Sequence, residues 1–368
     1  MVKLHENNLR KVAVFGLKGV PAIGGTASVG ENIVKELANQ YNFTIYATSS
    51  HASKKNPINN VRQYVFKKFL PHKLNVFYYN LMSAFHAVFF CNYDLVHTHQ
   101  IDTAFILPIL RLRYKVISTH HGRTYKMSKW GLIMRQFFRF NEWLMMKLAN
   151  QVTFVAKTEQ EDAEIKYGGS YVTIPNGINL DEEVETECAY SDYILFAAGR
   201  IIPHKGCHVF LEALKQINYP GKILIVGDHH QMPDYKAQLE AYKSVLDVEF
   251  LGMIKEKPKL LSIVGNAKLF VFPSFYEAMS IMLLEAVLVK VPIICSDIKE
   301  NTYIFDDDEI TFFKVGDVNG LCKEVNRFLD NPGLYKSKSD KAYRKLGENY
   351  SWSKIRLLYA KEYGALIW

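Results

Sequence analysis

The order of apolar segments along this 368-residue chain constrains its fold more than any single motif. Short apolar runs alternate with amphipathic stretches, and the alternation occurs in two similar passes. Apolar runs of about four to eight residues are typical of buried strands, whereas the stretches between them have the period of helices. Because strands that alternate with helices form parallel sheets, the sequence predicts two Rossmann-like, doubly wound α/β domains.

The two passes also predict where the domains lie. Strands are expected at residues 11–16, 43–47, 95–98, 116–119 and 152–156 of the first pass, and at 193–198, 222–226, 249–251, 269–272 and 291–295 of the second. The first helix is expected at 28–40. Asn176, Gly177 and an acidic stretch at 181–187 separate the passes. We therefore expect domains at residues 1–178 and 188–349.

The composition indicates a globular protein with an anionic partner. A net charge of +8 and a pI near 9.0 favour a nucleotide-sugar, a lipid surface or a nucleic acid, and do not choose among them. The five cysteines have neither metal-binding nor disulfide-framework spacing, which is typical of a reducing cytosol. The first residues are too polar for a signal peptide, and no run reaches the roughly 20 apolar residues of a membrane span. We expect a cytoplasmic protein, either soluble or peripherally bound to a membrane.

Two carboxylates, Glu277 and Glu285, lie in an apolar stretch where a buried helix should carry no charge. A carboxylate among Ala, Met, Ile and Leu is costly to desolvate unless it has a partner. Pro273 and Ser274 end the strand before them, so we expect a helix from about Ala278, with Glu277 at the strand-to-helix turn. Helical rise then separates the carboxylates by about 12 Å along the axis, which suits an elongated ligand held at both ends.

The backbone between these carboxylates also attracts an anion. The first turn of a helix has free N–H groups, which bind groups such as a diphosphate. A nucleotide-sugar has the matching order of groups: a sugar, a diphosphate and a ribose. In the alternative interpretation, Glu277 is an acid favoured by the helix dipole and Glu285 is a paired core carboxylate.

A second constellation follows strand 193–198. A loop with Gly199 and Pro203 delivers Arg200 and Lys205 to the head of an amphipathic helix. Two cations at such a turn can neutralise the leaving charge of a diphosphate, Arg as a fork and Lys as a point charge. The alternative is a solvated basic loop.

Together these stretches resemble the retaining nucleotide-sugar glycosyltransferases of family 4, also called group 1, which have the GT-B fold. The resemblance covers most of the chain and depends on the order and spacing of the motifs. These are a glycine-rich first loop, Gly-Arg-x4-Lys-Gly at 199–206, Val-Gly-Asp at 226–228, Phe-Leu-Gly at 250–252, the paired glutamates, and Tyr-Ser-Trp-Ser-Lys-Ile-Arg at 350–356. The resemblance implies two facing domains with a cleft between them, and a last helix, 350–368, that joins the first domain.

The resemblance also implies an activity. Such enzymes move a sugar from a nucleoside-diphosphate-sugar to a saccharide or lipid-linked saccharide, usually in cell-surface polysaccharide biosynthesis. A UDP- or GDP-sugar is the expected donor, no metal cofactor is expected, and lipid-linked acceptors lie at the inner leaflet of the membrane. In the family a donor phosphate oxygen takes the proton of the acceptor, so the sugar keeps its anomeric configuration.

By this resemblance, Glu277 holds the hydroxyls of the transferred sugar and Glu285 those of the ribose. Arg200 and Lys205 stabilise the departing diphosphate. The remaining donor-binding positions are Gly199 in the same loop as Arg200, Gly252 beside the base, and the N–H groups of Met279, Ser280 and Ile281.

The first domain supplies two further candidate positions. Gly24 and Gly25 match the paired glycines that in the family face the donor phosphates and the acceptor. His121 matches a Thr-x-His motif and follows a strand, so it can hydrogen-bond a sugar hydroxyl or shield developing positive charge. The alternative is a satisfied structural histidine, and the neighbouring His120 is the less favoured candidate.

Other classes of function are compatible with parts of the sequence. An NAD-dependent oxidoreductase or a nucleotide-sugar epimerase would use a similar fold, but the second strand ends at 45–50 without the acid that grips ribose. A nucleic-acid-binding protein would use the basic and aromatic residues, although no recognised module is present and we expect no nucleic-acid partner. The pairs His97/His99 and His229/His230 lack the further ligands of a zinc site.

Two features bear on specificity and location. Lys290 stands where the family usually has glycine, and 298–303 lacks a common glycine pair, which affects base and sugar preference.

The stretch 125–147 mixes basic residues with large aromatic residues. A helix of this kind can lie in an anionic membrane surface, but more often it packs on a core with snorkelling cations. The inner-leaflet acceptors of the family add a little weight to the membrane alternative.

Overall fold

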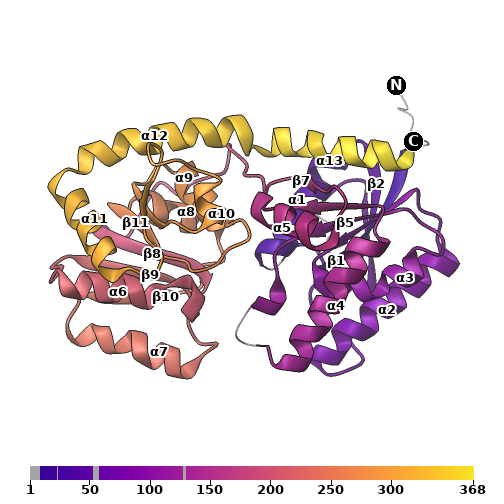
Figure 1. Cartoon of the computed structure of the whole chain (residues 1–368), viewed down its shortest axis with the longest axis horizontal. Coiled ribbons are helices and arrows are strands. Elements are labelled where there is room, and N and C mark those ends of the chain that lie inside the picture. Colours follow the sequence, from indigo (N-terminus) through magenta and orange to yellow (C-terminus); the bar gives the residue numbers. More distant parts are fainter. Residues whose placement is uncertain (1–8, 23, 53–57, 127–129) are drawn as a thin grey trace. The chain divides into compact units, whose positions relative to one another are not determined.

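The computed structural model describes residues 9–22, 24–52, 58–126 and 130–368. Within these ranges the chain forms two compact units (Figure 1). Unit 1 lies within residues 1–177 and 352–368, and unit 2 comprises residues 178–351. Each unit contains one sheet in which every strand pair is parallel, which confirms the predicted α/β class with two doubly wound sheets.

Unit 1 has a seven-stranded sheet in the order β3-β2-β1-β4-β5-β6-β7. Its strands are β1 (Arg10–Lys18), β2 (Tyr41–Thr48), β3 (Val61–Phe66), β4 (Leu95–His99), β5 (Val116–His120), β6 (Gln151–Phe154) and β7 (Val172–Thr173). The chain winds outward in opposite directions from β1 and β4. The loops that follow these two strands therefore diverge, which is where open parallel sheets bind ligands.

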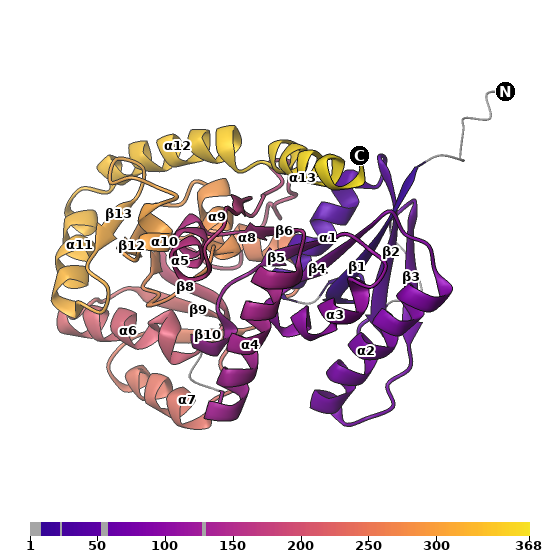
Figure 2. The same cartoon turned by 45° about the vertical axis from the view of Figure 1, so that its right-hand side comes forward.

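Helices cover both faces of this sheet (Figure 2). They are α1 (Gly25–Leu37), α2 (His72–Phe90), α3 (Leu107–Leu110), α4 (Leu132–Leu148), α5 (Lys157–Tyr167) and α13 (Trp352–Ile367), with 3-10 turns η1 (Ile101–Ile106) and η2 (Thr124–Lys126). Ala13 and Phe15 of β1 share a core with α2, α3 and α4. Because side chains alternate along a strand, Val12 and Val14 face the opposite side, where α1 contacts β1 and α13 contacts β4.

Unit 2 has a six-stranded sheet in the order β10-β9-β8-β11-β12-β13. Its strands are β8 (Tyr193–Arg200), β9 (Lys222–Asp228), β10 (Val248–Gly252), β11 (Leu269–Phe272), β12 (Ile293–Ser296) and β13 (Thr311–Phe313). Here the order reverses between β8 and β11. The predicted donor-binding loops follow these two strands, so they lie beside each other at the carboxyl edge of the sheet.

The helices of unit 2 also form two layers (Figure 1). They are α6 (Cys207–Gln216), α7 (Pro233–Glu240), α8 (Lys257–Gly265), α9 (Ile281–Leu288), α10 (Lys299–Thr302), α11 (Val318–Asp330) and α12 (Pro332–Asn349), with 3-10 turns η3 (Pro203–Lys205) and η4 (Ala241–Ser244). Ile194 and Phe196 of β8 pack with α6 and α11. Leu195 and Ala197 are buried on the other face, so β8 is apolar throughout, as its sequence indicates.

The structure departs from the predicted elements in two ways. Strands β3, β7 and β13 were not predicted; β7 and β13 are only two and three residues long, too short for a periodic pattern. The first helix begins at Gly25 and the helix after β11 at Ile281, whereas starts near 28 and 278 were predicted. Such shifts are expected, because capping decides where a helix begins.

Candidate active site

The centre of the candidate site is an ion pair between the two loops at the reversal point of unit 2. Lys205, at the end of η3, donates a hydrogen bond of 2.6 Å from Nζ to Oε1 of Glu277. Ser274, at the start of the loop after β11, donates to the same carboxylate oxygen at 2.7 Å. The fold thus brings together two residues, Lys205 and Glu277, that the sequence had assigned to one site from separate motifs.

Backbone contacts between the same two loops fix this ion pair. Gly206 has φ +75°, and a Cβ there would lie 2.0 Å from the carbonyl oxygen of Pro273. The amide of Phe275 donates to the carbonyl of His204 at 2.8 Å. Only glycine permits so close a contact at position 206, so the Lys205–Glu277 geometry depends on it.

The turn that follows Glu277 corrects one expectation. Ser280 is the N-cap of α9 and accepts a hydrogen bond of 3.4 Å from the amide of Leu283. Because the helix begins at Ile281, Glu277 and Met279 precede it, and the helical spacing of about 12 Å between the paired carboxylates does not apply. The first-turn amides at Ile281 remain at the head of α9, where an anion is favoured.

Glu285 lies within α9 and is buried, with 7% of its surface exposed. Its partner is Lys257, the first residue of α8, whose ammonium group bonds to its carboxylate. Burial raises the pKa of Glu285, and the attraction of Lys257 offsets only part of the rise. Sequence reasoning missed Lys257, because nothing in its local pattern separates it from the neighbouring lysines.

The remaining donor-binding candidates lie at strand ends of unit 2. Arg200 is the last residue of β8, is half-buried, and forms no ion pair with any residue of the described ranges. Gly199 and Gly252 have open space where a Cβ would be. Gly252 ends β10 with φ +70°, a conformation that favours glycine. The guanidinium of Arg200 is therefore free to meet a ligand at this edge.

In unit 1, Gly24 and Gly25 form the start of α1. Gly24 is the N-cap with φ +99°, and both glycines are exposed. Chain neighbours aside, no atom of the residues that the structure describes lies within 4 Å of a Cβ placed on Gly24. The space and the free amides at this helix start suit the close approach of an anionic group, as the resemblance implies.

His121 follows β5, and its Nε2 lies 3.0 Å from Nδ1 of His99, at the end of β4. Burial, together with the neighbouring histidines His97 and His120, lowers the pKa of His121 to about 3. His121 is therefore neutral near pH 7 and can exchange hydrogen bonds without carrying charge. His97, on β4, is bonded at 2.7 Å to both Tyr363 of α13 and Thr119.

His120 has a different environment from His121. Its ring is fully buried between Glu142 of α4 and Glu159 of α5. The sequence did not single out either carboxylate, because a glutamate on an amphipathic helix is normally exposed to solvent. Only the structure shows that both are buried.

Several other features of the sequence have structural explanations. Lys290 has φ +56°, which explains why a glycine is usual there, and its ammonium pairs with Asp340 at 3.1 Å. Acidic residues of the loop after α10 pair with lysines of α12, including Lys341 with Asp308. Across the ranges that the structure describes, no group of three or more His, Cys, Asp or Glu side chains is arranged to hold a metal ion.

The fold and the paired loops define the class of protein. Solved structures with the same fold include sucrose-phosphate synthase from Thermosynechococcus elongatus (TM-score 0.81, 18% identity, 97% of this chain and 99% of that chain). Another is HepE from Anabaena in complex with UDP and glucose (TM-score 0.77, 17% identity, 97% of this chain and 100% of that chain). Both likenesses concern the fold, and they show the two-domain GT-B architecture.

Family comparisons then identify the chain. The profile of the glycosyl transferases group 1 matches residues 182–349, and that of glycosyltransferase family 4 matches 23–182. This chain belongs to the group 1, family 4 glycosyltransferases, and it is a glycosyltransferase. Neither an oxidoreductase, an epimerase nor a nucleic-acid-binding function is supported.

Characterised relatives include UDP-Gal:alpha-D-GlcNAc-diphosphoundecaprenol alpha-1,3-galactosyltransferase from Escherichia coli. It is 27% identical over 273 residues, which cover 66% of this chain and 68% of the relative. Phosphatidyl-myo-inositol mannosyltransferase from Propionibacterium freudenreichii is 23% identical over 282 residues, which cover 72% of this chain and 68% of the relative.

Proposed function

We propose that this glycosyltransferase transfers a sugar, with retention of configuration, from a nucleoside-diphosphate-sugar to a saccharide or lipid-linked saccharide in cell-surface polysaccharide or glycolipid assembly. The observation that carries the proposal is the Lys205–Glu277 pair, held between the two loops at the reversal point of the unit 2 sheet. This position offers a cation and a carboxylate side by side, as the junction of a sugar and a diphosphate requires.

The donor would lie along the carboxyl edge of unit 2. Glu277 accepts hydrogen bonds from hydroxyls of the transferred sugar, and Arg200 and Lys205 bind the diphosphate. Glu285 accepts hydrogen bonds from the ribose, in place of its contact with Lys257. HepE, a neighbour in fold, binds UDP and UDP-glucose, which supports a uridine nucleotide as the first donor to test.

The chemical step needs charge stabilisation more than a protein base. The bond between C1 of the sugar and the phosphate oxygen breaks, and the acceptor oxygen bonds to C1 on the same face. The acceptor proton passes to a phosphate oxygen of the leaving diphosphate. Arg200 and Lys205 stabilise the negative charge that develops there, and we propose that no metal ion is required. In unit 1, His121, Gly24 and Gly25 are the proposed substrate-binding positions.

Thermal unfolding against UDP, GDP, ADP and dTDP tests the donor assignment. We expect one nucleotide to raise the melting temperature, by an amount that grows with the logarithm of its concentration. Sugars linked to the stabilising nucleotide are then assayed for nucleotide release. If none of the four nucleotides stabilises the protein, or if stabilisation survives in Arg200→Ala/Glu285→Ala, the donor site is not the one proposed.

We also propose contact with an anionic membrane through α2 and α4 of unit 1. The two helices touch where the rings of Phe77 and Phe137 lie 5.3 Å apart. Exposed apolar side chains on the two helices include Phe85, Phe89 and Phe90 of α2 and Leu132, Ile133, Phe140 and Trp143 of α4. Arg139 and Lys147 are exposed on α4 as well, and cations beside apolar groups match an anionic bilayer.

Flotation of the protein with lipid vesicles tests whether α4 contacts a membrane or only packs on the core of unit 1. Within the described ranges, no helix is both long and apolar enough to cross a bilayer, so binding would be peripheral. We expect binding to vesicles that contain phosphatidylglycerol, and loss of binding in Ile133→Ser/Trp143→Ser. Ile165→Ser is the control, because Ile165 is as exposed as Ile133 but lies on α5. Equal flotation of both variants would contradict the proposal.

A further inference from the structure

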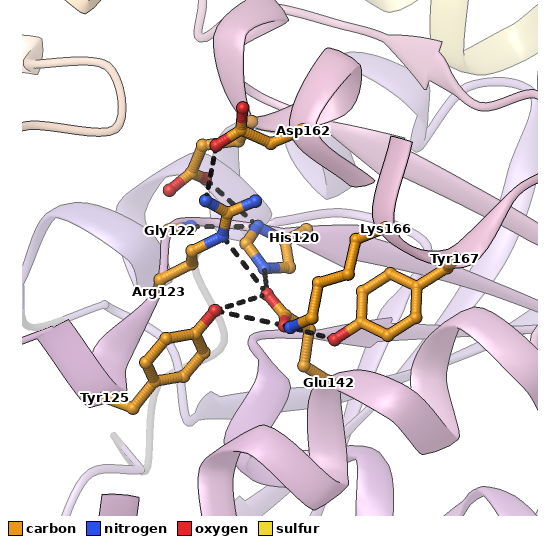
Figure 3. Close-up of polar contacts among 9 residues, drawn as sticks. His120, Gly122, Arg123, Tyr125, Glu142, Asp162, Lys166 and Tyr167 are labelled. Carbon is orange, nitrogen blue, oxygen red and sulfur yellow. Dashed lines mark hydrogen bonds and ion pairs between the residues drawn. The ribbon is translucent and has the colours of Figure 1, made fainter. Parts of the chain in front are cut away.

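A buried polar network surrounds Glu142 of α4, beside Gly122 and Arg123 of the loop that follows β5 (Figure 3). Five side chains approach its carboxylate: His120 at 3.3 Å, Arg123 at 3.4 Å, Lys166 at 3.0 Å, Tyr167 at 2.6 Å and Tyr125 at 3.1 Å. They come from the end of β5, the loop after it, η2 and α5. The network therefore ties the loop after β5 to both α4 and α5.

Charge balance in this network depends on His120. Glu142 and Glu159 are 1% and 2% exposed, and each meets one ring nitrogen of His120. Burial alone lowers the pKa of His120, but the hydrogen bonds and charges of Glu142 and Glu159 outweigh it and raise the pKa to about 8. Charged His120, Arg123 and Lys166 together balance Glu142, Glu159 and Asp162. Loss of the charge on His120 would leave a buried carboxylate uncompensated, which is costly.

Nδ1 of His120 faces two groups with opposite requirements. Oε2 of Glu159 lies 3.2 Å away and requires a proton on Nδ1. The backbone amide of Gly122 lies 3.3 Å away and requires a lone pair there. One nitrogen cannot do both, so the proton state of Nδ1 decides which contact forms.

Gly122 directly follows His121, and its φ of +109° favours glycine. Its amide N–H therefore belongs to the peptide unit that links Gly122 to His121, the candidate substrate-binding histidine. With His120 charged, Nδ1–H bonds to Glu159 and the Gly122 amide is released. With His120 neutral, the amide is bonded to Nδ1 and the peptide unit after His121 is drawn toward the buried network.

We propose that His120 is a positioning residue: its proton on Nδ1 holds Glu159, frees the Gly122 amide and so sets the orientation of His121 for sugar transfer. The proposal rests on the function proposed above for His121. The charged form is the active one. Transfer therefore decreases as pH rises through the titration of His120.

Other groups that face His120 do not titrate in the same range. Burial, with the charge of Glu142, raises the pKa of Tyr125 and Tyr167 well above the ordinary value of 10.0. Glu142 has a lowered pKa because its bonds to His120, Tyr167 and Lys166 outweigh burial. Arg123 also pairs with Asp162 at 2.6 Å and stays charged. Phe154 of β6 packs against the ring and has no charge.

Nuclear magnetic resonance of the full chain tests the structural half without any substrate. Histidine labelled at ring carbon Cε1 and glycine labelled at the amide nitrogen are observed from pH 6 to 10. We expect His120 and the Gly122 amide to titrate together near pH 8, and Glu159→Gln to lower both midpoints by at least about one unit. Glu161→Gln, an exposed acid on the same helix, should leave both unchanged. A Gly122 amide that does not titrate with His120 would overturn the proposal.

The functional half uses UDP release from UDP-glucose across the same pH range. We expect a descending limb near pH 8, which moves to lower pH in Glu159→Gln and not in Glu161→Gln. A purely structural role for Glu159 would lower the rate at every pH without moving the limb. A limb at the same pH in both variants would overturn the proposal. Absence of turnover with any sugar nucleotide would instead refute the proposed function, and the resonance titration would still decide the role of His120.

Discussion

Lys257 bonds through its ammonium group to the buried carboxylate of Glu285, at the junction of α8 and α9. Glu277 has the same relation to Lys205. Glu277 and Glu285 thus each form an ion pair with one lysine. In the proposed complex, hydroxyl groups of a bound donor would take over these carboxylate contacts.

Glu285→Ala is expected to weaken nucleotide binding by about tenfold or more, since about 1.4 kcal/mol corresponds to a factor of ten and hydrogen bonds to a charged group are worth at least this. Titration calorimetry with the nucleotide found in the melting panel measures it. Glu285→Gln should keep or raise the melting temperature, because burial raises the pKa of this carboxyl and makes its ionised form costly. Unchanged nucleotide affinity in the alanine variant would contradict the ribose assignment.

Lys205→Ala is expected to slow transfer by about 100-fold while changing donor affinity much less, because its charge acts mainly on the leaving diphosphate. Steady-state kinetics with separate kcat and KM values test this. Lys341→Ala is the matched control, since it removes a lysine from an exposed ion pair with Asp308. A loss confined to KM would show that Lys205 binds the ground state only.

Gly206→Ala is expected to destabilise the protein by about 1–3 kcal/mol and to reduce transfer, because its Cβ would meet the carbonyl of Pro273 at 2.0 Å and its φ is +75°. Denaturant unfolding measures the stability. Gly364→Ala is the contrasting variant: it lies inside α13 with free space around it, so a gain of about 0.5–1 kcal/mol is expected. Equal effects of the two changes would refute the close contact at Gly206.

The stability of unit 1 should decrease at both ends of the pH range. The pKa of Glu142 is lowered in the fold, so its contribution is complete above its ordinary value of 4.5 and is lost as pH decreases below it. The pKa of His120 is raised from 6.5 to about 8, so its contribution is complete below 6.5 and is lost as pH rises through 8. Melting temperatures from pH 4 to 9 test this.

Glu142→Gln provides the corresponding variant. Breaking a buried ion pair from one side costs about 3–5 kcal/mol, so we expect a large loss of stability at pH 6 and a weaker dependence on acid. Glu161→Gln should follow the unmodified protein. A variant that keeps the full acid dependence would show that other carboxylates cause it.

Chelation provides a test of the metal-free mechanism. We expect nucleotide release from the sugar nucleotide to persist in excess EDTA, because Arg200 and Lys205 supply the positive charge on the diphosphate. The measurement compares initial rates with and without EDTA, and after addition of Mg²⁺ or Mn²⁺. Loss of activity with EDTA and recovery with one of these ions would contradict the proposal.

The paired passes of apolar runs predicted the core strands of both sheets, since parallel strands buried on two faces are apolar at every position. The predicted strand at 269–272 coincides with β11. Element ends were less accurate. The helix that starts at Ile281 depends on the Ser280 cap, and β13 depends on pairing with β12, so neither is decided by a local period.

The candidate site residues also divide into those that the sequence singled out and those that only the structure revealed. Glu277 was singled out as a carboxylate in an apolar stretch, and Lys205 as a cation in the loop between a strand and a helix. In the fold, Nζ of Lys205 lies 2.6 Å from Oε1 of Glu277. Lys257 and Glu142 were missed, because a lysine or a glutamate in an amphipathic stretch is normally solvated. Only the packing of α8 against α9, and of α4 beside β5, reveals that their partners are buried.

The sequence by itself determined the class of fold and singled out the two motifs that contain Lys205 and Glu277, because hydrophobic period and residue type act over short stretches of chain. Tertiary structure alone decided which charges meet: the lysine on each paired glutamate and the two carboxylates around His120. These contacts join residues far apart in sequence and gain their strength from burial, which follows from the packing of whole helices and sheets and not from any local pattern.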